Sequence, residues 1–275
     1  MRPPAQPSRL KRSALRGSDN LSPAAAALLG FLAGCAPVAA DELVRFPSAG
    51  QGEASQGYLS RPKGQGPFPG VVLLHTCLGL PEARASLGAR IAAWGYVALF
   101  VDDFATRGLK ETCAVDFSQA LPDAYGALAY LGRLSYVDPA RIGAVGFSQG
   151  GDTALKIATG SGAGSVVGEG VVFKAAAAFY PPCANLAGAT LTIPTLILVG
   201  SRDEVTPAAD CARLAKQQAP DMAKLVAYAG AAHGFDLAEF GAGTKVMGML
   251  LAYDRSAAQR SWAELRGFLA ARLKR

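Results

Sequence analysis

The order of apolar and polar positions along the chain predicts strands and helices in alternation. Segments that are apolar at nearly every position are typical of strands buried on both faces of a sheet. These segments are 71–75, 96–101, 141–147, 173–180 and 195–199, and another follows at 224–228. The segments between and after them predict helices over 81–94, 117–134, 151–158, 207–218 and 256–273. Such alternation predicts a mostly parallel, doubly wound sheet with helices on both faces.

The remaining segments predict an entry hairpin and surface loops. Residues 42–46 and 53–61 predict an antiparallel hairpin ahead of the first buried strand. Residues 159–171 are rich in glycine and predict a surface loop, and we expect a second loop over 237–248. The predicted fold class is therefore α/β, with a single domain over 41–275.

The first forty residues have the pattern of an export signal. A basic segment over 9–16 precedes an apolar, alanine-rich run over 21–40. The run ends in Val38-Ala39-Ala40, a small-residue pattern typical of a cleavage site. An alternative is a lipoprotein signal, because Leu32-Ala33-Gly34-Cys35 resembles a lipobox that ends in a lipidated Cys35. We therefore expect a domain exported to the periplasm or beyond, or held by lipid in a bacterial envelope.

Composition and charge narrow the classes of function. The chain has 275 residues, of which 51% are hydrophobic and 17% charged, enough for one large core. Its formal net charge of +6 comes partly from the basic segment of the export signal. No basic stripe with interleaved aromatic residues is present, so we expect no nucleic-acid partner. The expected partner is a small molecule, the expected state is monomeric, and membrane contact requires lipidation at Cys35.

Gly146-Phe147-Ser148-Gln149-Gly150 is the stretch that indicates chemistry. It lies between a predicted strand and a predicted helix, which is the context of the nucleophile elbow in the α/β-hydrolase fold. In that turn a serine hydroxyl is exposed at the end of the sheet, and glycines on either side avoid a Cβ clash. Ser148 is therefore the candidate nucleophile.

A serine nucleophile needs a base and an acidic residue that orients the base. The chain has 2 histidines, and His233 follows the last predicted strand. Asp203 follows the preceding strand, so the order Ser148, Asp203, His233 is that of an α/β-hydrolase. Glu204 is the competing candidate for the acid. We expect His75 to be a structural hydrogen-bonding residue at the end of its strand.

The reaction also needs two donors for the developing oxyanion. One is the backbone N–H of Gln149, at the start of the helix after the nucleophile. The second is expected in the loop after 71–75, where the Cys77 N–H is the first choice and Thr76 the second. No spacing of cysteine or histidine indicates a metal site, and this chemistry requires no cofactor.

Four of the 5 cysteines lie in the predicted domain, and export to an oxidising compartment favours disulfides. Cys77 and Cys113 lie in loops after neighbouring strands. Cys183 follows a later predicted strand and Cys211 lies in the helix after the next one, so adjacent strands would bring these two together. We therefore predict the pairs Cys77–Cys113 and Cys183–Cys211. Four free, buried thiols are the alternative. The first pair would fix the oxyanion loop.

Together these motifs resemble the dienelactone hydrolase family of α/β-hydrolases. The resemblance rests on the elbow at Ser148, the Gly200-x-x-Asp203 loop with Thr206-Pro207, the His233-x-Phe235 turn and the segment 101–108. It implies an arginine that holds a substrate carboxylate, and Arg107 matches it. The founding members have a cysteine nucleophile and a second arginine, where this chain has Ser148 and, shortly after the histidine, Asp236 and Leu237.

The sequence therefore predicts a serine hydrolase of small carboxylic esters or lactones. Arg107, Phe147 and Phe235 are the candidate substrate-binding residues, although the aromatic pair also suits a core and Arg107 also suits an ion pair. A peptidase or amidase with the same three residues is one alternative. A non-catalytic α/β-hydrolase-fold protein that binds a partner in the cell envelope is the other.

Overall fold

The computed structural model describes residues 1, 41–50, 54–162 and 170–274. The predicted export signal at 2–40 and most of the predicted loop at 159–171 lie outside these residues. None of the helices in the described ranges is long and apolar enough to cross a membrane.

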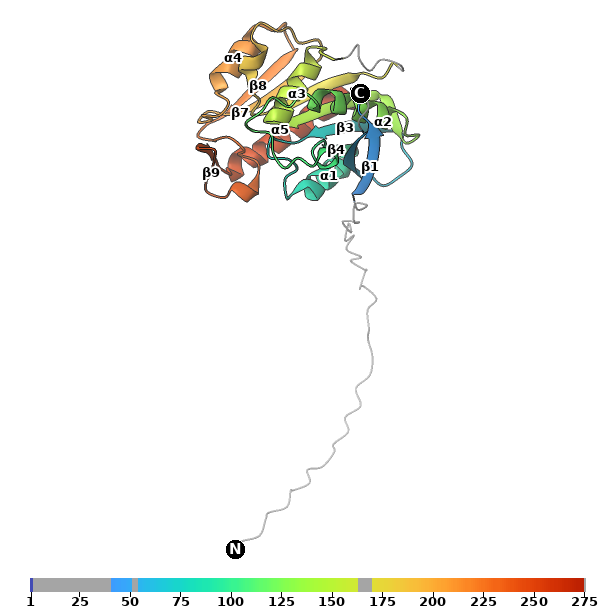
Figure 1. Ribbon diagram of the computed structural model, residues 1–275, viewed down its shortest axis with the longest axis horizontal. Helices are drawn as coiled ribbons and strands as arrows, with labels where there is room; N and C mark the ends of the chain where they lie inside the picture. Colours follow the sequence, from blue (N-terminus) through green and yellow to red (C-terminus); the bar gives the residue numbers. More distant parts are fainter. Residues whose placement is uncertain (2–40, 51–53, 163–169, 275) are drawn as a thin grey trace, which may run out of the picture. The chain divides into compact units, whose positions relative to one another are not determined.

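An 8-stranded sheet forms the centre of the fold, in the order β1-β2-β4-β3-β5-β6-β7-β8 (Figure 1). The strands are β1 (Glu42–Pro47), β2 (Ala54–Ser60), β3 (Phe68–Leu74), β4 (Val97–Asp102), β5 (Val137–Phe147), β6 (Phe173–Phe179), β7 (Thr195–Gly200) and β8 (Ala223–Tyr228). β2 pairs antiparallel with β1 and with β4, and the other neighbours are parallel. The predicted mostly parallel sheet with an antiparallel N-terminal hairpin is confirmed.

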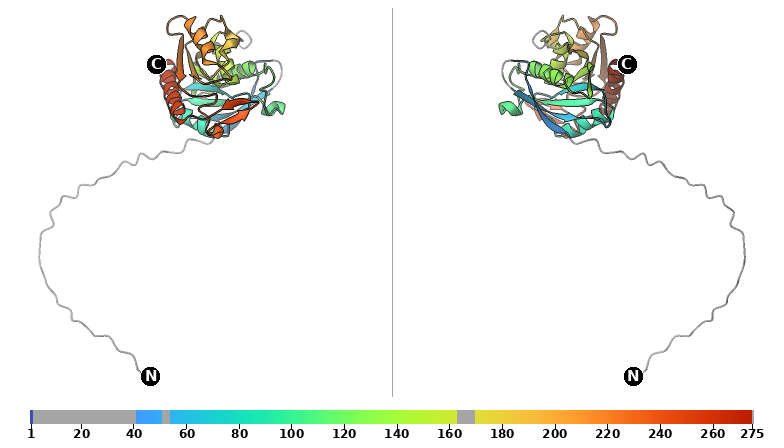
Figure 2. Two further views of the ribbon diagram at one scale, coloured as in Figure 1. Left: turned by 90° about the vertical axis from the view of Figure 1, so that its left-hand side faces the viewer. Right: turned by 90° about the vertical axis from the view of Figure 1, so that its right-hand side faces the viewer.

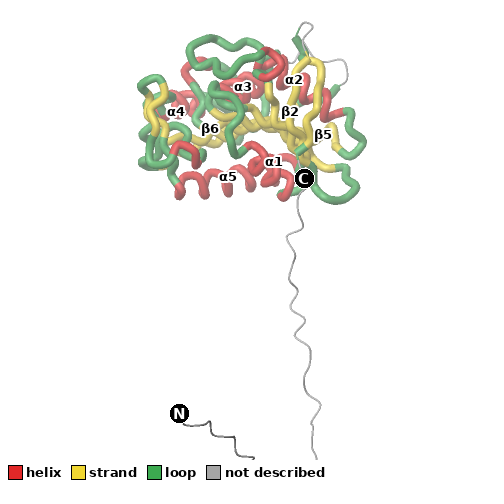
Figure 3. The backbone as a smooth tube through the Cα atoms, turned by 60° about the horizontal axis from the view of Figure 1, so that its bottom comes forward, coloured by secondary structure: helices red, strands yellow, loops and turns green. Residues whose placement is uncertain are grey.

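Helices cover both faces of this sheet, as predicted (Figure 3). They are α1 (Arg84–Ala93), α2 (Ala120–Gly132), α3 (Gln149–Ala158), α4 (Ala208–Lys216) and α5 (Arg255–Leu273), with the short 3₁₀ turns η1 (Ala105–Arg107), η3 (Cys183–Leu186) and η4 (Ala238–Phe240). α1 and α5 pack on one face, where α5 runs along the sheet (Figure 2), and α2, α3 and α4 pack on the other.

Successive side chains of a strand point to opposite faces of the sheet, so one apolar segment packs against the helices on both faces. Val71 and Leu73 of β3 belong to the core cluster that includes Trp262 of α5. Val72, between them, belongs to the opposite cluster, which includes Leu128 of α2. Because both faces of β3 are buried, every position from Val71 to Leu74 is apolar. A continuous apolar segment of this kind is what predicted the buried strand from the sequence.

The predicted loop over 237–248 is wrong in part, because it contains η4 and the first strand of a small hairpin. β9 (Thr244–Val246) pairs antiparallel with β10 (Met249–Leu251). The two turn residues, Met247 and Gly248, have φ of 51° and 82°. Two positive φ values are what a tight hairpin turn requires, but they are usually supplied by Asn-Gly or Asp-Gly, so Met-Gly gave no clear sequence signal.

Candidate active site

Ser148 lies in a strained turn between β5 and α3. Its φ is 53° and its ψ is −110°, a conformation that L-residues rarely adopt. A Cβ on Gly150 would lie 2.3 Å from the carbonyl oxygen of Leu74, so the chain can approach the end of β3 only with glycine there. The Gly150 N–H donates to the carbonyl of His75 at 3.0 Å. The turn is thus fixed against the neighbouring strand.

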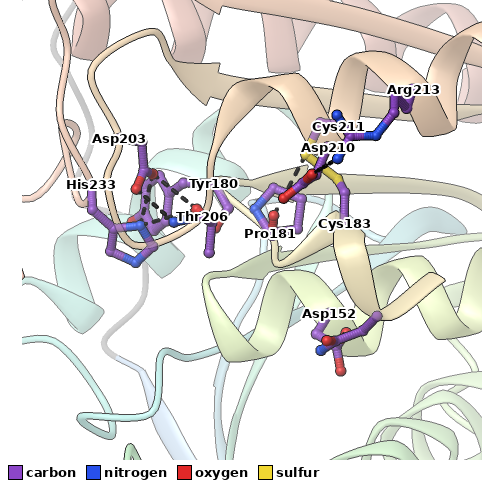
Figure 4. Close-up of a disulfide and its surroundings, with 11 residues drawn as sticks. Asp152, Tyr180, Pro181, Cys183, Asp203, Thr206, Asp210, Cys211, Arg213 and His233 are labelled. Carbon is purple, nitrogen blue, oxygen red and sulfur yellow. Dashed lines mark hydrogen bonds and ion pairs between the residues drawn. A yellow bond between two sulfur atoms is a disulfide. The ribbon is translucent and has the colours of Figure 1, made fainter. Parts of the chain in front are cut away.

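The three candidate catalytic residues come together at the carboxyl ends of the strands. His233 Nε2 lies 2.9 Å from Ser148 Oγ, and His233 Nδ1 lies 2.8 Å from Asp203 Oδ2. The exposed fractions of Asp203 and His233 are only 6% and 4%. Figure 4 shows the Asp203 carboxylate directed at the imidazole from the loop after β7. Burial shields this pair of hydrogen bonds from water and fixes the orientation of the ring.

Thr206 belongs to the motif of the Asp203 loop, but the sequence indicated no role for its side chain. The backbone N–H groups of Val205 and Thr206 donate to Asp203 Oδ1 at 2.9 and 2.8 Å. The Thr206 hydroxyl lies 2.9 Å from Asp203 Oδ2 and 3.3 Å from His233 Nδ1. These contacts hold the Asp203 carboxylate in place. Glu204, the alternative acid, is exposed.

The candidate oxyanion donors lie on either side of Ser148. Gln149 begins α3, so its N–H has no carbonyl partner within the helix. Cys77 lies in a tight turn after β3, closed by a Gly79 N–H to Thr76 carbonyl bond of 3.0 Å. The Thr76 hydroxyl accepts from the Leu78 N–H at 3.1 Å. Both Thr76 and Cys77 line the pocket at Ser148.

The two disulfides have the pairing that the sequence predicts. Cys77 is bonded to Cys113, and Cys183 to Cys211, with Cα–Cα distances of 4.8 and 5.0 Å. The first pair is partly exposed and lines the pocket at Ser148. The second is buried between η3 and α4, and Figure 4 shows it beside Pro181. Only the first disulfide therefore borders the candidate active site.

A narrow apolar pocket of about 40 Å³ opens on Ser148 and His233. Apart from the residues already described, its wall is mostly aliphatic or aromatic, and the side chains are Leu78, Tyr180, Val205, Leu237, Phe240, Val246, Met249 and Leu251. Several come from the β9–β10 hairpin, because β10 lies directly beside His233, the candidate base. Leu251 forms a bridge with His233, and the Ala252 N–H donates to the His233 carbonyl at 3.1 Å.

Phe147 and Phe235, two of the candidate substrate-binding residues, do not line this pocket. They are 3% and 0% exposed and belong to the core cluster on the α1 and α5 face of the sheet. Phe147 follows Gly146 along β5, and the alternation of the strand directs its side chain to Trp262, with ring centroids 6.1 Å apart. We therefore assign both rings to the core rather than to substrate binding.

Arg107, the third candidate, does not line the pocket either. Its guanidinium contacts both carboxylate oxygens of Asp123, at 2.7 and 3.2 Å, and donates to the Asp103 carbonyl at 2.6 Å. Burial raises the pKa of Asp123, although Arg107 opposes the shift. The structure thus brings Arg107 into an ion pair, which was the alternative to a substrate contact.

His75, the other histidine, is held by two oxygens and does not itself line the pocket. Its Nδ1 lies 2.7 Å from the Thr76 carbonyl and its Nε2 lies 2.7 Å from Asp103 Oδ1. Burial lowers the pKa of His75, but Asp103 and the Thr76 carbonyl outweigh it, and the net shift is upward. This arrangement agrees with a structural residue at the end of β3.

Asp236 and Tyr180 form a buried polar pair behind the candidate base. The Tyr180 hydroxyl donates to Asp236 Oδ1 at 2.8 Å, and the Tyr180 ring lies against the His233 imidazole with centroids 4.6 Å apart. The second oxygen, Asp236 Oδ2, has no hydrogen-bond partner among the described residues. Burial raises the pKa of Asp236 to about 6.

The chain is similar to several known hydrolases. Two cutinases, from Thermobifida cellulosilytica and Thermobifida fusca, are each 26% identical over 187 residues, which is 68% of this chain. The chain spans 66% and 58% of their lengths. A solved structure of a dienelactone hydrolase-like promiscuous phosphotriesterase from metagenomic libraries is 22% identical, with a TM-score of 0.64 over 84% of this chain and 98% of that one.

The family comparison covers nearly all of the described domain. Residues 55–273 match the model of the dienelactone hydrolase family. The match includes every strand of the large sheet except β1 and the start of β2, together with the elbow, the Asp203 loop and the His233 turn. The chain belongs to the dienelactone hydrolase family.

Proposed function

We propose that the chain is a serine hydrolase that cleaves small, uncharged carboxylic esters or lactones through an acyl-enzyme. The observation that carries the proposal is the continuous hydrogen-bonded series from Ser148 Oγ through His233 to Asp203, with contacts of 2.9 and 2.8 Å. A nucleophile, a base and an orienting acid at these distances match the requirements of acyl transfer. The family membership supports the same reaction class.

The proposed mechanism uses only side chains and backbone groups of the chain. Ser148 Oγ attacks the substrate carbonyl carbon while His233 Nε2 accepts the hydroxyl proton. Asp203 holds the imidazole with Nδ1–H directed at its carboxylate and stabilises the imidazolium. The oxyanion accepts hydrogen bonds from the Cys77 and Gln149 N–H groups. His233 then protonates the leaving alkoxide, and water activated by His233 hydrolyses the acyl-serine.

The pocket supports uncharged substrates. Among its lining residues there is no lysine or arginine that would bind a carboxylate, and Arg107 is in contact with Asp123 instead. A buried anion without a partner is costly. Small acyl groups fit the narrow pocket better than long chains, so we propose acetyl to butyryl esters and small lactones as the substrate class.

We also propose that residues 1–40 are an export signal and that residues 41–275 form one catalytic domain that acts as a monomer. The proposal is supported by the two disulfides, which favour an oxidising compartment. Cleavage after Ala40 would give a periplasmic or secreted enzyme, and lipidation at Cys35 an anchored one. Mass spectrometry of the mature N-terminus distinguishes the two.

The test is hydrolysis of p-nitrophenyl acetate by the mature protein and by Ser148→Ala. We expect rapid turnover by the wild type and a loss of roughly a thousandfold or more in the variant. Turnover that survives in the variant would contradict the assignment of Ser148. Matching p-nitroanilide substrates test the peptidase or amidase alternative. A folded wild-type protein that cleaves neither class favours a non-catalytic binding protein.

A further inference from the structure

The two proposed oxyanion donors belong to segments that are far apart in the sequence. Cys77 lies in the turn after β3, and Gln149 begins α3. Their N–H groups stabilise the same oxygen only if both are held at about 3 Å from it, and a small displacement of either weakens the transition state. The structure must therefore contain contacts that fix one segment relative to the other.

Thr112 contacts both segments. Its backbone N–H donates to the carbonyl of Cys77 at 2.8 Å. Its hydroxyl donates to Gln149 Oε1 at 3.0 Å. Thr112 is only 3% exposed, so water does not readily replace either hydrogen bond. A single buried residue thus links Cys77, which carries one donor, to the side chain of Gln149, which carries the other.

The neighbouring residue adds a covalent link. Cys113 is bonded to Cys77, so the segment that contains Thr112 stays next to the oxyanion turn. The Cys113 N–H also donates to Glu111 Oε2 at 2.9 Å, which restrains the backbone on the other side of Thr112. On the opposite flank, the bond from the Gly150 N–H to the His75 carbonyl at 3.0 Å joins the same two segments.

We propose that Thr112 is a positioning residue for the oxyanion hole, which acts by holding the Cys77 turn and the Gln149 side chain at a fixed separation. The inference rests on the proposed function. Thr112 itself does not line the pocket and does not touch the reacting atoms. The hydroxyl is the group that matters for Gln149, whereas the backbone N–H serves Cys77 whatever the side chain is.

Thr112→Val is the variant that isolates the hydroxyl, because valine has nearly the same shape and keeps the backbone N–H. Loss of the hydroxyl leaves the Gln149 amide without this partner and loosens the start of α3. We expect kcat for p-nitrophenyl acetate to fall roughly tenfold with KM nearly unchanged, since the contact matters most for the transition state. Thr112→Ser restores the hydroxyl and is expected to recover most of kcat.

Thr195→Val is the matched control. Thr195 is also a buried threonine, 1% exposed, and its hydroxyl donates to the Ile193 carbonyl at 2.9 Å. It begins β7. It therefore lies at the amino ends of the parallel strands, whereas Ser148 lies at their carboxyl ends. We expect Thr195→Val to lower the melting temperature about as much as Thr112→Val does. Unlike Thr112→Val, it is expected to leave kcat unchanged.

The outcomes separate this inference from the proposed function. If Thr112→Val keeps kcat within twofold of the wild type, or if Thr112→Ser is as impaired as Thr112→Val, the positioning role of the hydroxyl is wrong. A fall in kcat that Thr195→Val reproduces also contradicts it. In each of these cases Ser148→Ala still abolishes turnover. Turnover that persists in Ser148→Ala contradicts the proposed function itself.

Discussion

A Cβ placed on Gly146 would lie 1.9 Å from the carbonyl oxygen of Gly150. No real Cβ contact is so short, and the obstructing atom belongs to the backbone, which cannot rotate away. Glycine is therefore required at position 146 by the first turn of α3 folding back over β5, whereas Gly150 is required by the end of β3.

We predict that Gly146→Ala removes activity and lowers the free energy of unfolding by at least about 3 kcal/mol, because the elbow must open to admit the methyl group. Chemical unfolding followed by circular dichroism measures the change. Gly267→Ala is the control, since nothing lies within 4 Å of a Cβ built there and Gly267 is within the exposed part of α5. In the Gly267→Ala variant the free energy of unfolding is expected to rise by about 0.5–1 kcal/mol.

Asp203→Asn tests which acidic residue orients His233. The amide keeps the shape of the carboxylate but loses the charge that stabilises the imidazolium, so we expect kcat to fall roughly a thousandfold or more. Glu204→Gln is the matched control on the adjacent, exposed residue and is expected to keep wild-type kcat. A reversed pattern would assign the role to Glu204. Ester hydrolysis at a fixed pH measures both variants.

The buried Asp236 makes stability depend on pH. Because burial raises the folded-state pKa of Asp236 to about 6 from 3.8, the folded protein binds more protons than the unfolded chain between these values. Its stabilising contribution is therefore complete below about pH 4 and is lost as the pH rises through about 6.

Asp236→Asn removes this titration and keeps an oxygen that can accept from the Tyr180 hydroxyl. We predict that at pH 8 the variant is more stable than the wild type by up to about 2–3 kcal/mol, and that the difference shrinks towards pH 4. Urea unfolding at several pH values measures it. A difference that stays constant with pH would show that Asp236 does not titrate in this range.

The two disulfides close loops of similar length, with sequence separations of 36 and 28. Removal of either pair is therefore expected to cost a similar amount of stability, about 3–4 kcal/mol by chain entropy. Their effects on activity should differ, because only Cys77–Cys113 borders the pocket.

We predict that Cys77→Ser/Cys113→Ser lowers kcat roughly tenfold, whereas Cys183→Ser/Cys211→Ser keeps kcat at temperatures where it is folded. Assays well below both melting temperatures compare them. Equal kcat in the two double variants would mean that the disulfide beside the oxyanion turn serves stability alone.

The β9–β10 hairpin is expected to limit the size of the substrate. Met249 lines the pocket, whereas Met247 at the tip of the same hairpin is 61% exposed. Met249→Ala removes part of the wall, so we expect the ratio of kcat/KM for p-nitrophenyl hexanoate over acetate to rise roughly five- to tenfold. Met247→Ala is expected to leave that ratio unchanged. A parallel shift in both variants would indicate a change in hairpin mobility rather than in pocket width.

Some features of the fold and site could be predicted from local sequence. Each buried parallel strand is a nearly continuous apolar run, and the elbow has a fixed spacing because a Cβ on Gly146 would meet the backbone of Gly150 in the same motif. The order of Ser148, Asp203 and His233 follows from where the parallel strands end. Those constraints act over short stretches, so they leave a visible pattern in the chain.

Other features depended on contacts between distant residues. The Thr206-Pro207 motif indicated no role for the Thr206 hydroxyl, which contacts Asp203 and His233. Thr112 lies in no motif, and it contacts Cys77 and Gln149. Phe147 and Arg107 looked suitable for substrate binding, but strand alternation and Asp123 direct them elsewhere.

The sequence by itself determined the fold class, the disulfide pairs and the identity of the candidate nucleophile, base and acid, because each is encoded by a periodicity or by position after a strand. Only the tertiary structure decided the wall of the pocket and the contacts that hold the oxyanion turn. The Met247-Gly248 turn and the Thr112 hydroxyl acquire their roles by packing near the carboxyl ends of the strands. Packing between segments that are distant in the chain leaves no recognisable local pattern in the sequence.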